Sequence, residues 1–269
     1  MRILGAGLVL SIVSAGLAFA ADDTRVSGAA ERQDWASVGA LIEAGADVTA
    51  TQRDGATALH WAAHWNDMTT AAALIDAGAD VDAVNDLGVP SLWIATDNGS
   101  AEMALLLIDA GANVNVRLPS GETMLMTAAR QGLRSVVSVM LLRGADLRLA
   151  EHEAAQTALM WAAAGGHSGI VSLLAESGVN IRASTTRGFT AMMFAARAGD
   201  VNTARLLLDA GAALEGRAID GSTPLLVASR STDALAGIDW RIIPSDSGHQ
   251  DTAFFLIEQG ADVAAADRI

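Results

Sequence analysis

Gly45-Ala46-Asp47-Val48 is the first of seven similar tetrapeptides along the chain. The other six begin at Gly78, Gly111, Gly144, Gly178, Gly211 and Gly260, so successive glycines are 33, 33, 33, 34, 33 and 49 residues apart. A nearly constant period of this length is typical of a solenoid, in which each repeat buries its apolar face only against its neighbours. The sequence therefore predicts one elongated array rather than a globular domain.

The second repeat carries the fullest motif, which reads Asp54-Gly55-Ala56-Thr57-Ala58-Leu59-His60-Trp61-Ala62-Ala63. Related segments follow at residues 121–129, 156–163, 188–196 and 221–228. This pattern resembles the ankyrin repeat, Gly-x-Thr-Pro-Leu-His-x-Ala-Ala followed by a second helix that ends in Leu-Leu-x-x-Gly-Ala-Asp/Asn. The resemblance covers about residues 24–263. It implies an all-α solenoid of about seven helix-hairpin units with short β-hairpin loops.

The residues of each unit have physical roles that agree with this fold. A threonine stands where its hydroxyl can cap the first helix in five units, at Thr57, Thr123, Thr157, Thr190 and Thr223. Pro90 replaces it in the third unit, where we expect a weaker helix start. A leucine four residues before the glycine is expected to face inward, and the glycine ends the second helix. One extra residue lies between Gly144 and Thr157, in a hairpin that lacks its usual glycine.

The expected array spans residues 21–269, in units at about 24–50, 51–83, 84–116, 117–150, 151–183, 184–216 and 217–269. The first unit is a helix pair without a leading hairpin, and polar outer positions suit it to cap the stack. The last unit carries an insert at residues 231–250, which includes Ile238, Trp240 and Ile242. These apolar side chains either pack back onto the last repeat as a cap or form a partner-binding lip.

Residues 1–20 have the layout of a secretory signal peptide. An apolar run at residues 3–17 precedes the small-x-small site Ala18-Phe19-Ala20, and we predict cleavage after Ala20. The protein is then periplasmic or secreted. An uncleaved membrane anchor is the alternative, because the apolar run is close to the shortest that spans a bilayer.

Composition narrows the classes of function. The net charge is −14, with no cysteine. Such an acidic chain disfavours nucleic acid, whose phosphates it would repel, and the charge chiefly favours solubility. Without cysteine, disulfides and thiolate metal sites are excluded.

No catalytic constellation stands out. His60 and His64 are four residues apart, but no third metal ligand or His-Glu-x-x-His frame accompanies them. Trp61 and Trp161 occupy the same register, which indicates packing between repeats or, alternatively, a ligand cage. The sequence predicts a protein that is not an enzyme and that uses no cofactor and no metal.

Ankyrin-like stacks bind other proteins on a concave face, formed by the hairpin tips and the exposed side of the first helices. Carried over by register, together with one residue of the insert, the candidate partner-binding residues are Arg53, Asp54, His64, Trp65, Asp97, Asn98, Glu122, Arg130, Gln131, Arg187, Phe189, Arg197, Asp220, Arg230 and Trp240. We expect Trp65, Phe189 and Arg197 to be exposed anchors, because aromatic side chains and arginine are favoured as hot spots.

The predicted function is that of an exported, non-catalytic, monomeric scaffold. Its expected partner is another protein of unknown identity, with no nucleic acid and no membrane contact after signal cleavage. The alternative is a truncated recognition module of a larger envelope enzyme or cytochrome, because the sequence stops at Ile269 where another unit is expected.

Overall fold

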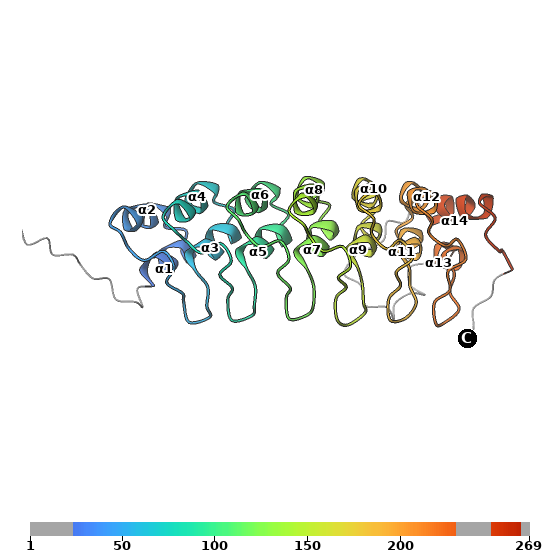
Figure 1. Ribbon diagram of the computed structural model, residues 1–269, viewed down its shortest axis with the longest axis horizontal. Helices are drawn as coiled ribbons and strands as arrows, with labels where there is room; N and C mark the ends of the chain where they lie inside the picture. The colour runs from blue at the N-terminus through green and yellow to red at the C-terminus, as the bar shows by residue number, and fades with distance from the viewer. Residues whose placement is uncertain (1–23, 230–248, 265–269) are drawn as a thin grey trace, which may run out of the picture.

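The computed structural model describes residues 24–229 and 249–264. The predicted signal peptide, Arg230 and Trp240 lie outside these ranges. The described residues form seven helix pairs, which stand side by side in one row (Figure 1). The pairs are α1 (Arg25–Glu31) and α2 (Trp35–Glu43), α3 (Ala58–His64) and α4 (Met68–Asp76), α5 (Ser91–Asp97) and α6 (Ala101–Asp109), α7 (Met124–Arg130) and α8 (Arg134–Leu142), α9 (Ala158–Ala164) and α10 (Ser168–Glu176), α11 (Ala191–Ala198) and α12 (Val201–Asp209), and α13 (Pro224–Ser229) and α14 (His249–Glu258).

The helices form two layers. The odd-numbered first helices lie in one layer and the even-numbered second helices in the other, with the hairpins projecting away from the second layer (Figure 1). Each first helix contacts the first helices of the adjacent units, as α7 contacts α5 and α9. No helix in the described ranges is long and apolar enough to cross a membrane. The predicted helical solenoid is confirmed.

The core is a continuous apolar seam between the layers. The leucines predicted to face inward are fully buried at Leu74, Leu107, Leu174, Leu207 and Leu256. Each such side chain contributes about 1.5–3 kcal/mol relative to an exposed position. Leu41 is only half-buried, because its helix α2 has a neighbouring second helix on one side only.

Threonine hydroxyls cap most of the first helices, as predicted. The hydroxyls of Thr57, Thr123, Thr157 and Thr223 accept the backbone N–H three residues later, at 3.3–3.5 Å. Pro90 begins α5 without a side-chain cap. Thr190 departs from the prediction, because its hydroxyl makes no hydrogen bond within the described part of the chain.

The hairpins turn on glycines with positive φ, such as Gly55 at 78° and Gly121 at 84°. In the fifth unit Ala155 takes this role at φ 58°, without the freedom that glycine has. The Glu151 carboxylate holds this irregular turn, because it accepts the backbone N–H groups of Glu153, Ala154 and Gln156 at 2.7–2.9 Å. The predicted extra residue is therefore accommodated inside the hairpin.

Candidate functional site

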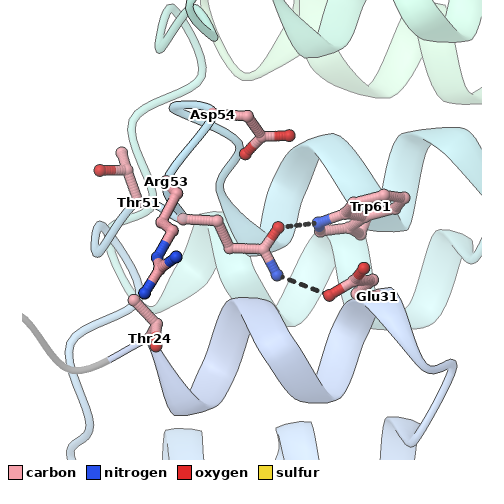
Figure 2. A pocket seen from close by; sticks show the side chains of 7 residues that line it. Thr24, Glu31, Thr51, Arg53, Asp54 and Trp61 are labelled. Carbon is pink, nitrogen blue, oxygen red and sulfur yellow. Dashed lines mark hydrogen bonds between the residues drawn. The ribbon is translucent and has the colours of Figure 1, made fainter.

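A groove of about 690 Å³ opens beside the hairpin of the second unit (Figure 2). Its walls come from α1, α3 and the hairpin that precedes α3. The lining residues are Thr24, Glu31, Thr51, Gln52, Arg53, Asp54 and Trp61. Two of them, Arg53 and Asp54, belong to the predicted binding face.

A chain of two hydrogen bonds fixes the groove. Trp61 Nε1 donates to Gln52 Oε1 at 3.0 Å, and Gln52 Nε2 donates to Glu31 Oε2 at 2.9 Å (Figure 2). These bonds join the hairpin to the first helices of two units. Side chains held in this way lose little conformational entropy when a ligand binds.

Arg53 and Asp54 form the exposed rim of the groove. Asp54 Oδ1 accepts the backbone N–H of Ala56 at 3.1 Å, so its carboxylate is held in place. Arg53 extends on the side of Thr24 (Figure 2) and makes no ion pair with any residue of 24–229 or 249–264. The rim therefore presents one positive side chain, Arg53, and one negative side chain, Asp54.

An aromatic cluster continues from the groove along α3. The rings of Trp61 and His64 meet edge to face at a centroid distance of 5.9 Å, and those of His64 and Trp65 do so at 4.6 Å. Trp65 is 43% exposed, which confirms its predicted accessibility. The second unit thus carries an exposed indole and a polar groove, which are connected by the rings of His64 and Trp61.

The candidates of the third and fourth units form a network with one another. Arg130 Nη2 lies 2.6 Å from Asp97 Oδ1 and 3.4 Å from Glu122 Oε1. Gln131 Nε2 donates to the carbonyl oxygen of Asp97 at 2.7 Å. The Arg130 side chain is only 13% exposed and packs over Trp161, 5.4 Å from the ring centroid. Its charge is compensated within the protein, so this cation is held between repeats.

Asn98 also joins two repeats, because its Nδ2 donates to the carbonyl oxygen of His64 at 3.2 Å. Asn98 and Gln131 therefore satisfy carbonyl groups at the ends of the preceding first helices. Register alone predicted Asn98 and Gln131 to be partner-binding residues. In the structure both donate hydrogen bonds that link adjacent repeats.

Two of the three predicted anchors are buried, and the expectation that they are exposed is wrong. Phe189 is 7% exposed, and its backbone is bonded across its own hairpin to Thr185 in both directions, at 2.9 and 2.8 Å. Arg197 is also 7% exposed and lies over the Phe194 ring at 5.4 Å. Burial lowers the pKa of the Arg197 guanidinium below its usual range. Neither side chain is available as an anchor.

The remaining candidates lie towards the C-terminal end. Arg187 is exposed, and Asp220 is half-buried and accepts the backbone N–H of Ser222 at 2.9 Å. Arg230 and Trp240 fall outside the described residues, as does the choice between a cap and a lip for the insert.

His60 has a structural role that uses both ring nitrogens. Its Nδ1 accepts the backbone N–H of Thr57 at 3.1 Å, and its Nε2 donates to the carbonyl oxygen of Val89 at 3.0 Å. Burial is the main cause that lowers the pKa of His60 below 6.5. With both nitrogens engaged, this side chain has no free lone pair for a metal. The described ranges contain no group of three or more possible metal ligands.

Comparisons with known proteins agree with this architecture. A family model described as ankyrin repeats (3 copies) matches residues 27–118, 92–185, 125–218 and 178–267. The crystal structure of the human ASB11 ankyrin repeat domain is 22% identical, with a TM-score of 0.70, and the match covers 89% of this chain and 99% of that one. The ankyrin repeat domain of Bcl-3, a member of the IkappaB protein family, is 25% identical, with a TM-score of 0.64 and coverage of 80% and 99%. No match is found among proteins of curated function. These overlapping matches cover nearly the whole of this chain, which therefore belongs to the ankyrin repeat family.

Proposed function

We propose that this protein is an exported, non-catalytic scaffold that binds another protein on its concave face, with the second repeat at the centre of the site. Ankyrin repeats generally act as protein–protein interaction modules, and the fold is typically non-catalytic. The proposal adds a place for the contact and a compartment. It assigns no cofactor.

The exposed indole of Trp65 is the observation that carries the proposal. It packs against His64, whose ring also meets that of Trp61, and Trp61 is itself bonded into the wall of the groove. Binding energy at interfaces concentrates in a few aromatic and arginine side chains.

The rim of the groove indicates the chemistry of the partner. Arg53 and Asp54 present opposite charges at the groove, and the same repeat carries the exposed Trp65. A protein segment with an apolar side chain flanked by one acidic and one basic group would complement this surface. The overall charge of −14 argues against a polyanion such as nucleic acid.

Export rests on the sequence of residues 1–20. The expected mature chain begins at Ala21 and is periplasmic or secreted and monomeric. N-terminal sequencing of the protein from envelope and periplasmic fractions tests this part. A chain that retains Met1 in the membrane fraction would instead support the uncleaved anchor.

Binding is tested with two matched aromatic variants. Wild-type protein is used to capture partners from a periplasmic extract, and the captured protein is then titrated against Trp65→Ala and Phe254→Ala. Phe254 is 55% exposed on α14, away from the second repeat, and serves as the control. We expect Trp65→Ala to weaken binding about tenfold or more and Phe254→Ala to leave it unchanged. Equal binding by wild type and Trp65→Ala would refute the assignment of the site.

A further inference from the structure

The fourth unit differs in charge from the rest of the chain. Residues 117–150 contain five arginines against Glu122 and Asp146, a net charge of +3. The other six units range from −4 to 0 in a protein whose net charge is −14. Two of these arginines, Arg130 and Arg143, are paired with Asp97 and Asp109 of the third unit. The others make the fourth unit the part of the chain that repels anions least.

The same unit exposes a leucine where the other units carry an acid. Leu142, the last residue of α8, is 83% exposed. The corresponding positions of the other second helices are Glu43, Asp76, Asp109, Glu176, Asp209 and Glu258. A single exposed leucine needs no explanation by itself. An apolar residue at an otherwise acidic position, in the only basic unit, is a more specific signal.

A groove of about 680 Å³ is lined chiefly by residues 144–149, which follow Leu142 in the chain. Its lining includes Leu147 and Leu149, which are half-buried, together with Asp146 and Arg148. Here the arm of the hairpin leaves α8. The groove therefore combines apolar surface with charged side chains, and the exposed Leu142 precedes it closely in the chain.

The charges around this groove are not balanced. Arg148 donates from Nε and Nη2 to the two oxygens of Asp146, at 3.0 Å each. Hydrogen bonds from Arg148, followed by the charges of Arg148 and Arg117, hold the pKa of Asp146 below its usual value. Arg117 donates to the carbonyl oxygen of Ala150 and contacts His152, and it forms no ion pair with any of the described residues.

The other two exposed arginines do not add to this charge. Arg143, which follows α8, is paired with Asp109 at 3.1 Å. Arg134 stands at the other end of α8 from Leu142 and donates to the carbonyl oxygen of Gly169. Arg117, Arg148 and Asp146 together leave a net charge of +1 beside the groove.

We propose that Leu142, the groove at residues 144–149 and the flanking Arg117 and Arg148 form a second docking site, which binds a short acidic protein segment with apolar side chains. The apolar side chains cover Leu142 and the Leu147–Leu149 groove, and the carboxylates meet the arginines. Leu142 belongs to the layer of second helices, whereas the concave site lies on hairpins and first helices (Figure 1). The two proposals are independent.

A peptide fits this surface better than a lipid bilayer. The neighbouring third and fifth units carry net charges of −4 and −2. A flat anionic membrane would face those units as well, whereas a short segment can stay within the fourth. At physiological salt the Debye length is about 8 Å, so the charges of one unit interact mainly with groups in contact with that unit.

The probe is a fluorescein-labelled peptide that alternates Asp-Asp-Leu and Glu-Glu-Leu, with a second peptide that carries serine in place of leucine. The full mature chain is titrated in a fluorescence anisotropy assay. The test variants are Leu142→Glu, which restores the acid of the other units, and Leu142→Gln, which adds no charge. Ile219→Glu is the control, because Ile219 is equally exposed, at 77%, in the hairpin of the seventh unit.

We expect the leucine peptide to bind wild type and Ile219→Glu alike, and both Leu142 variants to bind about tenfold more weakly or worse. Binding should weaken as salt is raised. Equal affinity of wild type and Leu142→Gln for the leucine peptide would overturn the proposal, as would equal affinity of wild type for the serine peptide. Phosphatidylserine vesicles that bind wild type but not Leu142→Glu would overturn it in favour of a membrane site.

Discussion

The backbone N–H of Asp86 donates a hydrogen bond to the carbonyl oxygen of Asp54, 2.8 Å away, and joins the hairpin tips of the second and third repeats. Equivalent bonds of 2.8–2.9 Å join His152 to Ser120, Thr186 to Ala154, and Ile219 to Arg187. At the junction between the third and fourth repeats the donor would be Pro119, which has no N–H. The hydrogen bonds between tips are therefore interrupted at this junction.

Hydrogen exchange should reveal these bonds between tips. We expect the amide hydrogens of Asp86, His152, Thr186 and Ile219 to exchange much more slowly than those of an unfolded chain, although they lie on projecting hairpins. Each must break a bond to the neighbouring repeat before it exchanges. NMR-detected exchange at residue resolution provides the measurement. Exchange at unfolded-chain rates at all four sites would mean that the tips move independently.

Ala155 supplies a second prediction, because its left-handed φ of 58° is costly for any residue with a β-carbon. Ala155→Gly should raise the free energy of unfolding by about 0.5–1 kcal/mol, measured by urea titration. Gly121→Ala is the opposite case. Its β-carbon would meet the His152 ring at 2.6 Å and φ is +84°, so this variant should be less stable than wild type. If Ala155→Gly had the same free energy of unfolding as wild type, the Glu151 carboxylate, and not backbone freedom, would determine the cost of this turn.

Burial of His60 predicts a loss of stability on the acid side. Its folded pKa lies below 6.5, so the unfolded chain binds more protons at this site when the pH falls. The stability contributed by neutral His60 is complete above pH 6.5 and is lost as the pH falls from there through the folded pKa. His60→Met places here the residue found at Met126, Met160 and Met193 in the same register.

The free energy of unfolding of wild type and His60→Met should be compared by urea titration between pH 7.5 and pH 5. We expect the variant to lose less stability across this range than wild type, whatever their difference at pH 7.5. Parallel curves for the two proteins would show that protonation of His60 does not contribute to acid sensitivity.

The period of the sequence predicted the helix pairs, the inward leucines and most helix caps, because these depend on residues close together in the chain. The bonds between repeats could not be predicted in this way. The Gln52–Glu31 bond spans 21 residues and the Arg130–Asp97 pair spans 33, and both depend on how far one unit is displaced against the next. The sequence does show where one bond between hairpin tips is missing, because Pro119 has no backbone N–H to donate.

The candidate site was predicted only in part, for a related reason. Register identifies which positions belong to the predicted binding face, but the exposure of a side chain there depends on its neighbours. Trp65 stays accessible at 43%, whereas Phe189 and Arg197 are covered at 7% each. The groove residues Glu31 and Gln52 were missed, because polar residues in a hairpin and a terminal helix resemble a solvated surface.

The burial of Arg197 leads to the last prediction. Its guanidinium packs over Phe194, and its backbone carbonyl accepts a hydrogen bond from His249 Nε2 at 2.7 Å. Arg197→Ala removes a buried side chain with its packing, so the free energy of unfolding should fall by about 1–3 kcal/mol. Arg187→Ala, at an exposed position of the same unit, should change it by less than about 0.5 kcal/mol. Urea unfolding followed by circular dichroism measures both. If Arg197→Ala were as stable as Arg187→Ala, the buried guanidinium would contribute nothing to the stability of the stack.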